Sequence, residues 1–203
     1  MAQNMFVLFI KNLQVRLLIL GLVGMTVFGA ALFSAPSLRR PATASAMFAT
    51  ITVTTTADTV AADGQCSLRE AIQAANTNTA VNECAAGAAG LDTIQFNIGV
   101  GTPTINVTSA LPAVSEPVII NGNTGGATRV ELNGLGAGAG VTGLTITAGG
   151  STVQALVINR FTANGISLAT GGGNAVRGCI IGLNSAGTTD QGNTLIGISV
   201  SSP

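Results

Sequence analysis

Two cysteines and a serine–glutamate pair, close together in the sequence, are the residues best placed to do chemistry. Cys66 and Cys84 lie 18 residues apart and could form a disulfide or contribute thiolates to a metal site. Ser67 and Glu70 have the Ser-x-x-Glu spacing of a capping box, in which each side chain accepts a hydrogen bond from the other residue's backbone amide. We therefore expect a helix to begin at Ser67.

The residues after Ser67 extend this helix signal. Leu68, Ile72 and Ala75 recur at helical spacing and would share one apolar face. The predicted helix runs from Ser67 to about Asn76, and the rest of the chain after the N-terminal segment reads as short strands. A single short amphipathic helix before a long β region is typical of a plug that covers an open end of sheet.

The same residues resemble a known family. Asp63-Gly64-Gln65-Cys66-Ser67-Leu68-Arg69-Glu70-Ala71-Ile72, Ala74-Ala75-Asn76 and Gly90-Leu91-Asp92-Thr93-Ile94-Gln95-Phe96 are similar to the N-terminal module of bacterial CSLREA-domain proteins. The resemblance extends from about Ile51 to the C-terminus. It implies export and a right-handed parallel β-helix. It implies no settled activity and no catalytic residues.

Composition fits a β solenoid. Charged residues make up 8% of the 203 residues, aromatic residues 3%, and there are 27 glycines. Short apolar runs separated by Gly, Asn, Ser and Thr follow Asp92, and several of the Asn would stack in ladders at the turns. We predict an all-β fold with a short N-terminal capping helix.

An internal repeat favours stacked coils. Val153–Ile158 matches Val176–Ile181 at an offset of 23, and Gly143–Ile146 matches Gly165–Leu168 at an offset of 22. Such a period with short strands indicates a solenoid. A β-sandwich, which also has short strands at regular spacing, is the alternative fold.

The N-terminus reads as a targeting segment. Lys11 and Arg16 precede an apolar run over 17–33, and Ala44-Ser45-Ala46 has the form of a cleavage site. We predict a signal peptide over 1–46, with an uncleaved membrane anchor as the alternative. The CSLREA-type cap would then span 47–98 and the β-helix repeats 99–203, with the repeats expected to continue in a longer protein. Membrane contact is expected only through the N-terminal segment.

Charge argues against nucleic acid as a partner. After residue 46 there are four arginines, no lysine and eight carboxylates, a net charge of −4. Nucleic-acid binding requires clustered Lys and Arg that neutralise phosphates. The remaining basic residues are Arg69, Arg129, Arg160 and Arg177.

In an exported protein we expect a Cys66–Cys84 disulfide. These residues flank the predicted helix and a polar loop, whose closure contributes about 3 kcal/mol in the chain-entropy model. Cys179 shares the register of Leu156, so we expect it to be a buried free thiol. Metal binding is the alternative for the cysteines, but the chain has no histidine.

Catalytic groups are scarce. The acids after Asp92 are Glu116, Glu131 and Asp190, which are far apart in sequence, and the region after residue 46 has no His, Tyr or Lys to act as a base. We predict no catalytic, cofactor-binding or metal-binding residues. Asp58, Asp63 and Asp92 could instead be calcium ligands.

These observations predict a secreted or cell-surface structural and binding module. We expect adhesion or carbohydrate contact through an exterior array of Thr, Ser and Asn, with a polysaccharide or another cell-surface ligand as partner. The alternative is the N-terminal part of a β-helix polysaccharide lyase or hydrolase whose catalytic residues lie outside this chain.

Overall fold

The computed structural model describes residues 48–201, which form an all-β fold with a single helix. The predicted signal segment, 1–46, lies outside the described residues. In chain order the elements are β1 (Thr50–Val53), α2 (Leu68–Thr77), β2 (Asp92–Phe96), β3 (Thr104–Asn106), β4 (Val118–Asn121), β5 (Val130–Asn133), β6 (Leu144–Ile146), β7 (Thr152–Gln154), β8 (Leu156–Asn159), β9 (Ile166–Leu168), β10 (Ala175–Arg177), β11 (Ile180–Ile181) and β12 (Ile198–Val200).

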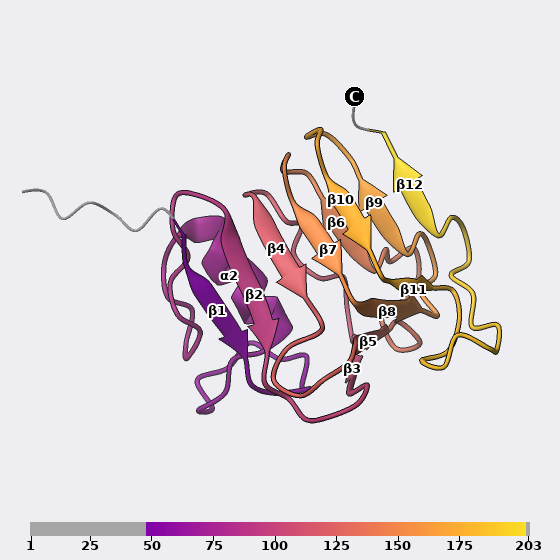
Figure 1. Cartoon of the computed structure of the whole chain (residues 1–203), viewed down its shortest axis with the longest axis horizontal. Helices are drawn as coiled ribbons and strands as arrows, with labels where there is room; N and C mark the ends of the chain where they lie inside the picture. The colour runs from indigo at the N-terminus through magenta and orange to yellow at the C-terminus, as the bar shows by residue number, and fades with distance from the viewer. Residues whose placement is uncertain (1–47, 202–203) are drawn as a thin grey trace, which may run out of the picture. The chain divides into compact units, whose positions relative to one another are not determined.

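The strands form three sheets, and every pair of neighbouring strands in them is parallel (Figure 1). The β1 sheet has the order β1-β2-β4-β7-β10, the β3 sheet β11-β8-β5-β3, and the β6 sheet β12-β9-β6. From β4 onward the chain visits the three sheets in turn, and then starts again at the β1 sheet. Successive passes therefore stack strand on strand.

Strand registers join the segments that the sequence comparison had matched. Val153 pairs with Val176, 23 positions later, and Leu144 pairs with Ile166, 22 positions later. Other steps are longer: Ile120 pairs with Val153, 33 positions later. Loops of different length absorb the difference, so the spacing read from the sequence applies only to part of the chain.

Alternating side chains build the core. In β2 the burial pattern is buried–intermediate–buried, as expected for a strand with one face inward. Ile51, Ile94, Ile120 and Val153 pair in register across the β1 sheet and are at most 2% exposed. Each buried side chain of this size contributes roughly 1.5–3 kcal/mol relative to an exposed one. The stacked aliphatic row is thus a main source of cohesion between strands.

Helix α2 begins and ends with recognisable caps. Ser67 is the N-cap and forms the predicted capping box with Glu70, and Asn78 closes the C-terminus in the left-handed conformation. Leu68, Ala71, Ile72, Ala74 and Ala75 are buried and belong to the same core as the strands. The helix lies against β1 and β2 (Figure 1). The predicted helix is confirmed, and it ends one residue later than expected.

A bend separates β7 from β8 in a segment that the sequence comparison treated as a single repeat unit. Ala155 adopts a positive φ of 54°, and Gly178, the equivalent residue in the next pass, has a φ of 58°. Gly122 occupies the same place one pass earlier, and a Cβ there would clash with the carbonyl oxygen of Ala155. Close backbone stacking at this turn therefore requires glycine at position 122.

Cys179 is less buried than predicted. The residue follows Gly178 and packs against the core, in the register expected from Leu156, but it is only half-buried whereas Leu156 is fully buried. β11 is the outermost strand of the β3 sheet, so within the described residues no strand covers its outer edge. Leu156 is covered because β8 lies between two strands.

Candidate functional site

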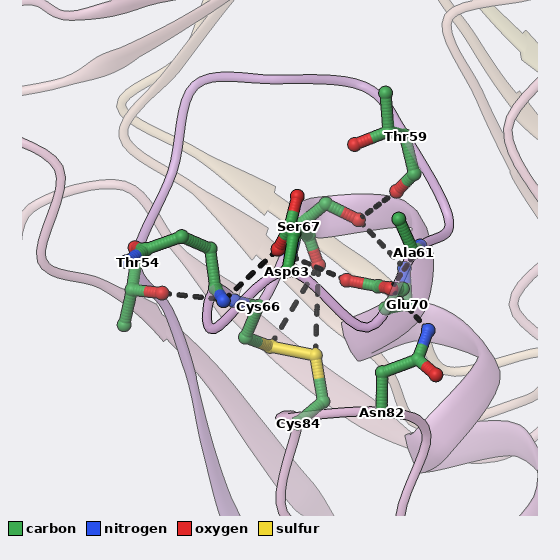
Figure 2. The surroundings of a disulfide bond; sticks show 10 residues. Thr54, Thr59, Ala61, Asp63, Cys66, Ser67, Glu70, Asn82 and Cys84 are labelled. Carbon is green, nitrogen blue, oxygen red and sulfur yellow. Dashed lines mark hydrogen bonds between the residues drawn. A yellow bond between two sulfur atoms is a disulfide. The ribbon is translucent and has the colours of Figure 1, made fainter.

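The region around α2 contains the predicted chemistry-bearing residues, and the structure shows how each is used. Cys66 and Cys84 form a disulfide, with Cα atoms 4.9 Å apart and both residues 2% exposed (Figure 2). This confirms the predicted pairing. The backbone amide of Thr54 donates to the carbonyl of Cys66 at 2.8 Å. The disulfide therefore anchors the 79–91 loop to the start of α2 and to the chain leaving β1.

Glu70 is a buried carboxylate with protein donors on both oxygens. Its Oε2 accepts from the Ser67 amide at 2.9 Å, and its Oε1 accepts from the Ala61 amide at 2.9 Å and from Asn82 Nδ2 at 2.6 Å (Figure 2). Burial alone would raise the pKa of Glu70, but these hydrogen bonds outweigh it and hold the pKa below its ordinary value. Glu70 thus fastens two loops to the helix as a charged group.

Arg69 forms an ion pair with Asp58, the only ion pair among the described residues. Arg69 Nε donates to Asp58 Oδ1 at 3.0 Å and Nη2 donates to Oδ2 at 2.8 Å. The guanidinium also donates to the carbonyls of Ser109 and Ala110. The side chain of Asp58 is fully buried and that of Arg69 is 12% exposed. The pair therefore clamps segments before and after α2 to the helix.

The C-terminal end of α2 is fastened in the same way. Asn76 Nδ2 donates to the carbonyl of Ala113 at 2.7 Å, and Asn76 Oδ1 accepts from the amide of Ser115 at 2.8 Å. Asn78 Nδ2 donates to Glu116 Oε2 at 3.0 Å. Arg69, Glu70 and Asn76, which are polar residues of the CSLREA-like stretch, thus all form hydrogen bonds with other groups of the protein. This pattern indicates a structural cap whose polar residues hold loops.

A different surface presents polar side chains outward. Strand pairing in the β1 sheet aligns one residue from each strand on the outer face. We call this set the amide row; it consists of Thr52, Gln95, Asn121, Gln154 and Arg177. Its first four members are half-buried and Arg177 is exposed. Gln95 Nε2 donates to Thr52 Oγ1 at 3.0 Å, so the first two side chains of the row touch.

The outer face of the β3 sheet is occupied by internal contacts. Asn133 Nδ2 donates to Asn106 Oδ1 at 2.9 Å, which is an amide contact between neighbouring strands of the kind we expected at the turns. Glu131 accepts from Thr104 at 2.7 Å and from Asn159 at 2.7 Å. Asn159 is fully buried. These groups therefore stabilise the stack.

The candidate catalytic acids lie on different elements. Glu116 contacts the end of α2, Glu131 lies on β5, and Asp190 lies in the loop between β11 and β12. Burial raises the pKa of the Cys179 thiol, which makes it a poor nucleophile at neutral pH.

The three candidate calcium ligands are separated too. Asp58 pairs with Arg69, Asp63 accepts from the Gln65 amide at 3.0 Å, and Asp92 accepts from the amides of Ala49 and Ala88. Residues 48–201 contain no group of three or more His, Cys, Asp or Glu that could hold a metal ion. Each aspartate has a local structural partner instead.

Comparisons with known proteins add no relative: no family model matches the chain, and no curated protein or solved structure gives a significant match. Nor does any helix within the described range have the length and apolar character needed to span a membrane.

Sequence reasoning missed the Arg69–Asp58 pair and the alignment of the amide row. Gln154 and Arg177 could have been aligned from the 23-residue offset, because they are equivalent positions in the two matched segments. The other residues of the amide row pair across sequence separations of different length, and no sequence pattern indicated those pairings.

Proposed function

We propose that this chain is an exported structural and binding module of a bacterial cell-surface or extracellular protein of the CSLREA-domain type. Its strands would form a right-handed parallel β-helix capped by α2. The support is that the chain passes through three parallel sheets in turn. Connections between parallel strands are right-handed in nearly all proteins, which supports the proposed hand.

The alignment of polar side chains in the amide row is the main support for a binding role. Thr, Gln, Asn and Arg side chains on adjacent strands offer hydrogen-bond donors and acceptors at intervals of about 4.8 Å. This interval is similar to the length of one sugar unit in an extended polysaccharide, so successive units could meet successive strands. Individual contacts would be weak, and affinity would grow with the number of units engaged at once.

Location and partner class have separate support. The Cys66–Cys84 disulfide is consistent with an oxidising, extracellular compartment. The predicted signal segment points the same way. The excess of carboxylates over arginines after residue 46 argues against nucleic acid as the ligand.

Binding can be tested by affinity electrophoresis of the full chain, secreted by a bacterial host, in gels containing single polysaccharides. Gln154→Ala removes a member of the amide row, and Thr152→Ala removes the hydroxyl beside it in the other outward row of β7. Thr145→Ala makes the matched threonine change on the outer face of the β6 sheet. We expect the first two variants to lose retardation and Thr145→Ala to keep it. Equal retardation of all three would overturn the proposed site.

The same preparations test the enzymatic alternative. We expect no release of reducing ends or unsaturated products from pectin, alginate or similar polymers, with or without calcium. Product release that disappears in Glu116→Gln, Glu131→Gln or Asp190→Asn would favour a polysaccharide lyase or hydrolase instead.

A further inference from the structure

We infer that the polymer bound by the amide row is a uronic-acid polysaccharide, whose carboxylates are taken by Arg177 and Arg129. This inference rests on the proposed function and adds the chemical class of the ligand. Three observations support it: the distribution of charge on the β1 sheet, the bond from Arg129 to the carbonyl of Gly178, which follows Arg177, and the absence of ion-pair partners for both arginines within residues 48–201.

The outer face of the β1 sheet has no carboxylate in either of its outward rows. The amide row contains one charged residue, Arg177, and the parallel row consists of Thr50, Thr93, Ile119, Thr152 and Ala175. Residues 48–201 as a whole carry eight carboxylates and four arginines. An acidic chain therefore presents a face without acids, and the only formal charge in its outward rows is positive.

A second arginine reaches the end of this face. Arg129 precedes β5, and its Nε donates to the carbonyl of Gly178 at 3.2 Å, directly beside Arg177. The Arg129 guanidinium therefore reaches the residue that follows Arg177 in sequence, at the end of β10.

Neither Arg129 nor Arg177 forms an ion pair within residues 48–201, unlike Arg69. The sole ion pair in the described part of the chain is Arg69–Asp58, and the single hydrogen bond recorded for the Arg129 side chain uses Nε. Arg177 is exposed. Planar guanidinium groups bind planar carboxylates through two parallel hydrogen bonds, so an acidic sugar suits these arginines better than a neutral one.

The arginines lie at one end of the amide row, which spans four strand spacings, or about 19 Å. Hydroxyl groups of the polymer would contact Gln95, Asn121 and Gln154. A carboxylate of the polymer would bind Arg177 and Arg129. Neutral polar contacts along the row and a charge-assisted contact at its end together distinguish an acidic polymer from a neutral one.

The test compares two forms of one polymer: polygalacturonate and the same polymer with its carboxylates methyl-esterified. Binding of the full chain is measured with the polymer immobilised on a sensor surface, because the protein has no Trp or Tyr to report binding by fluorescence. Arg177→Gln and Arg129→Gln remove one charge each at that end of the amide row. Arg160→Gln removes the same charge after β8 and serves as the matched control.

We expect polygalacturonate to bind about tenfold more tightly than the esterified form, since a hydrogen bond to a charged group is stronger than one to a neutral group. Arg177→Gln and Arg129→Gln should each abolish most of that difference, and Arg160→Gln should keep it. Far-UV circular dichroism and thermal midpoints should be unchanged in all three variants.

Any of four results would overturn the inference. If both forms of the polymer bind equally and Gln154→Ala weakens both, the proposed function stands and the acidic ligand is wrong. If Arg160→Gln weakens binding as much as Arg177→Gln, the attraction is non-specific. If dextran sulfate, relative to dextran, gains more than polygalacturonate gains over its ester, the anionic group is sulfate. Failure to bind any polysaccharide would remove the proposed function as well.

Discussion

The guanidinium of Arg69 and the carboxylate of Asp58 form two hydrogen bonds, of 3.0 and 2.8 Å, at a site where the Asp58 side chain is fully buried. Asp58 also accepts from the amide and the hydroxyl of Thr108. One ion pair thus joins the loop before α2, the helix itself and the segment after β3. The arginine of the CSLREA-like stretch therefore has a structural role in this chain.

Removing one partner of this pair should be costly. Arg69→Gln leaves the buried carboxylate of Asp58 without its counter-charge, and we expect a loss of about 3 kcal/mol in the free energy of unfolding. Urea unfolding followed by far-UV circular dichroism measures it. The double variant Arg69→Gln/Asp58→Asn should lose less than the sum of the two single variants. Additive losses would mean that the two side chains do not interact.

The disulfide should account for two of the three cysteines. Thiol labelling of the unfolded, unreduced full chain should modify Cys179 alone, and labelling after reduction should modify all three cysteines. Cys84→Ser should lower the free energy of unfolding by about 3 kcal/mol, because the loop is no longer closed in the unfolded state. Cys179→Ser, the control, should change it much less. Free thiols at both Cys66 and Cys84 would contradict the pairing.

Glu70 should make stability depend on pH in acid. Because the folded-state pKa of Glu70 lies below its ordinary value, the stabilisation is fully present above the pKa that Glu70 has in the unfolded chain. It is lost as the pH falls through the lower, folded-state pKa. Glu70→Gln should be less stable at pH 7 and should lose less further stability on acidification. Glu83→Gln, a change on an exposed residue of the neighbouring loop, is the control. Parallel pH profiles for Glu70→Gln and the unmodified chain would disprove this account.

The helix cap and the helix face should fail for different reasons. Ser67 Oγ accepts from the Glu70 amide at 3.2 Å and donates to the Thr59 carbonyl at 2.6 Å. We expect Ser67→Ala to cost about 1 kcal/mol. Leu68→Asp should cost more, because it places an unpaired charge in the core at a residue that is 1% exposed. Thermal unfolding followed by circular dichroism compares them with Ser109→Ala, an exposed control. An unchanged midpoint in Leu68→Asp would show that α2 does not cover the core.

The helix cap, the disulfide and part of the repeat could be predicted from the sequence, because each depends on residues that are close together in the chain. Ser67 and Glu70 are three residues apart, so the capping box and the start of α2 followed from spacing alone. Cys66 and Cys84 flank one helix–loop unit, and only Cys179 remained as a competitor for pairing. Two passes with steps of 22 and 23 residues were also visible, because the loops between their strands are short.

The tertiary structure alone decided which distant residues meet. Thr52 pairs with Gln95 across 43 positions, Gln95 with Asn121 across 26, and Asn121 with Gln154 across 33. Loops of such unequal length hide the register, since no fixed period relates one strand to the next. The choice of Asp58 as the partner of Arg69 depends in the same way on a loop folding back over α2. Sequence determined the helix, the disulfide and the short strands; packing of those strands in parallel determined the polar face, because only strand pairing aligns its side chains.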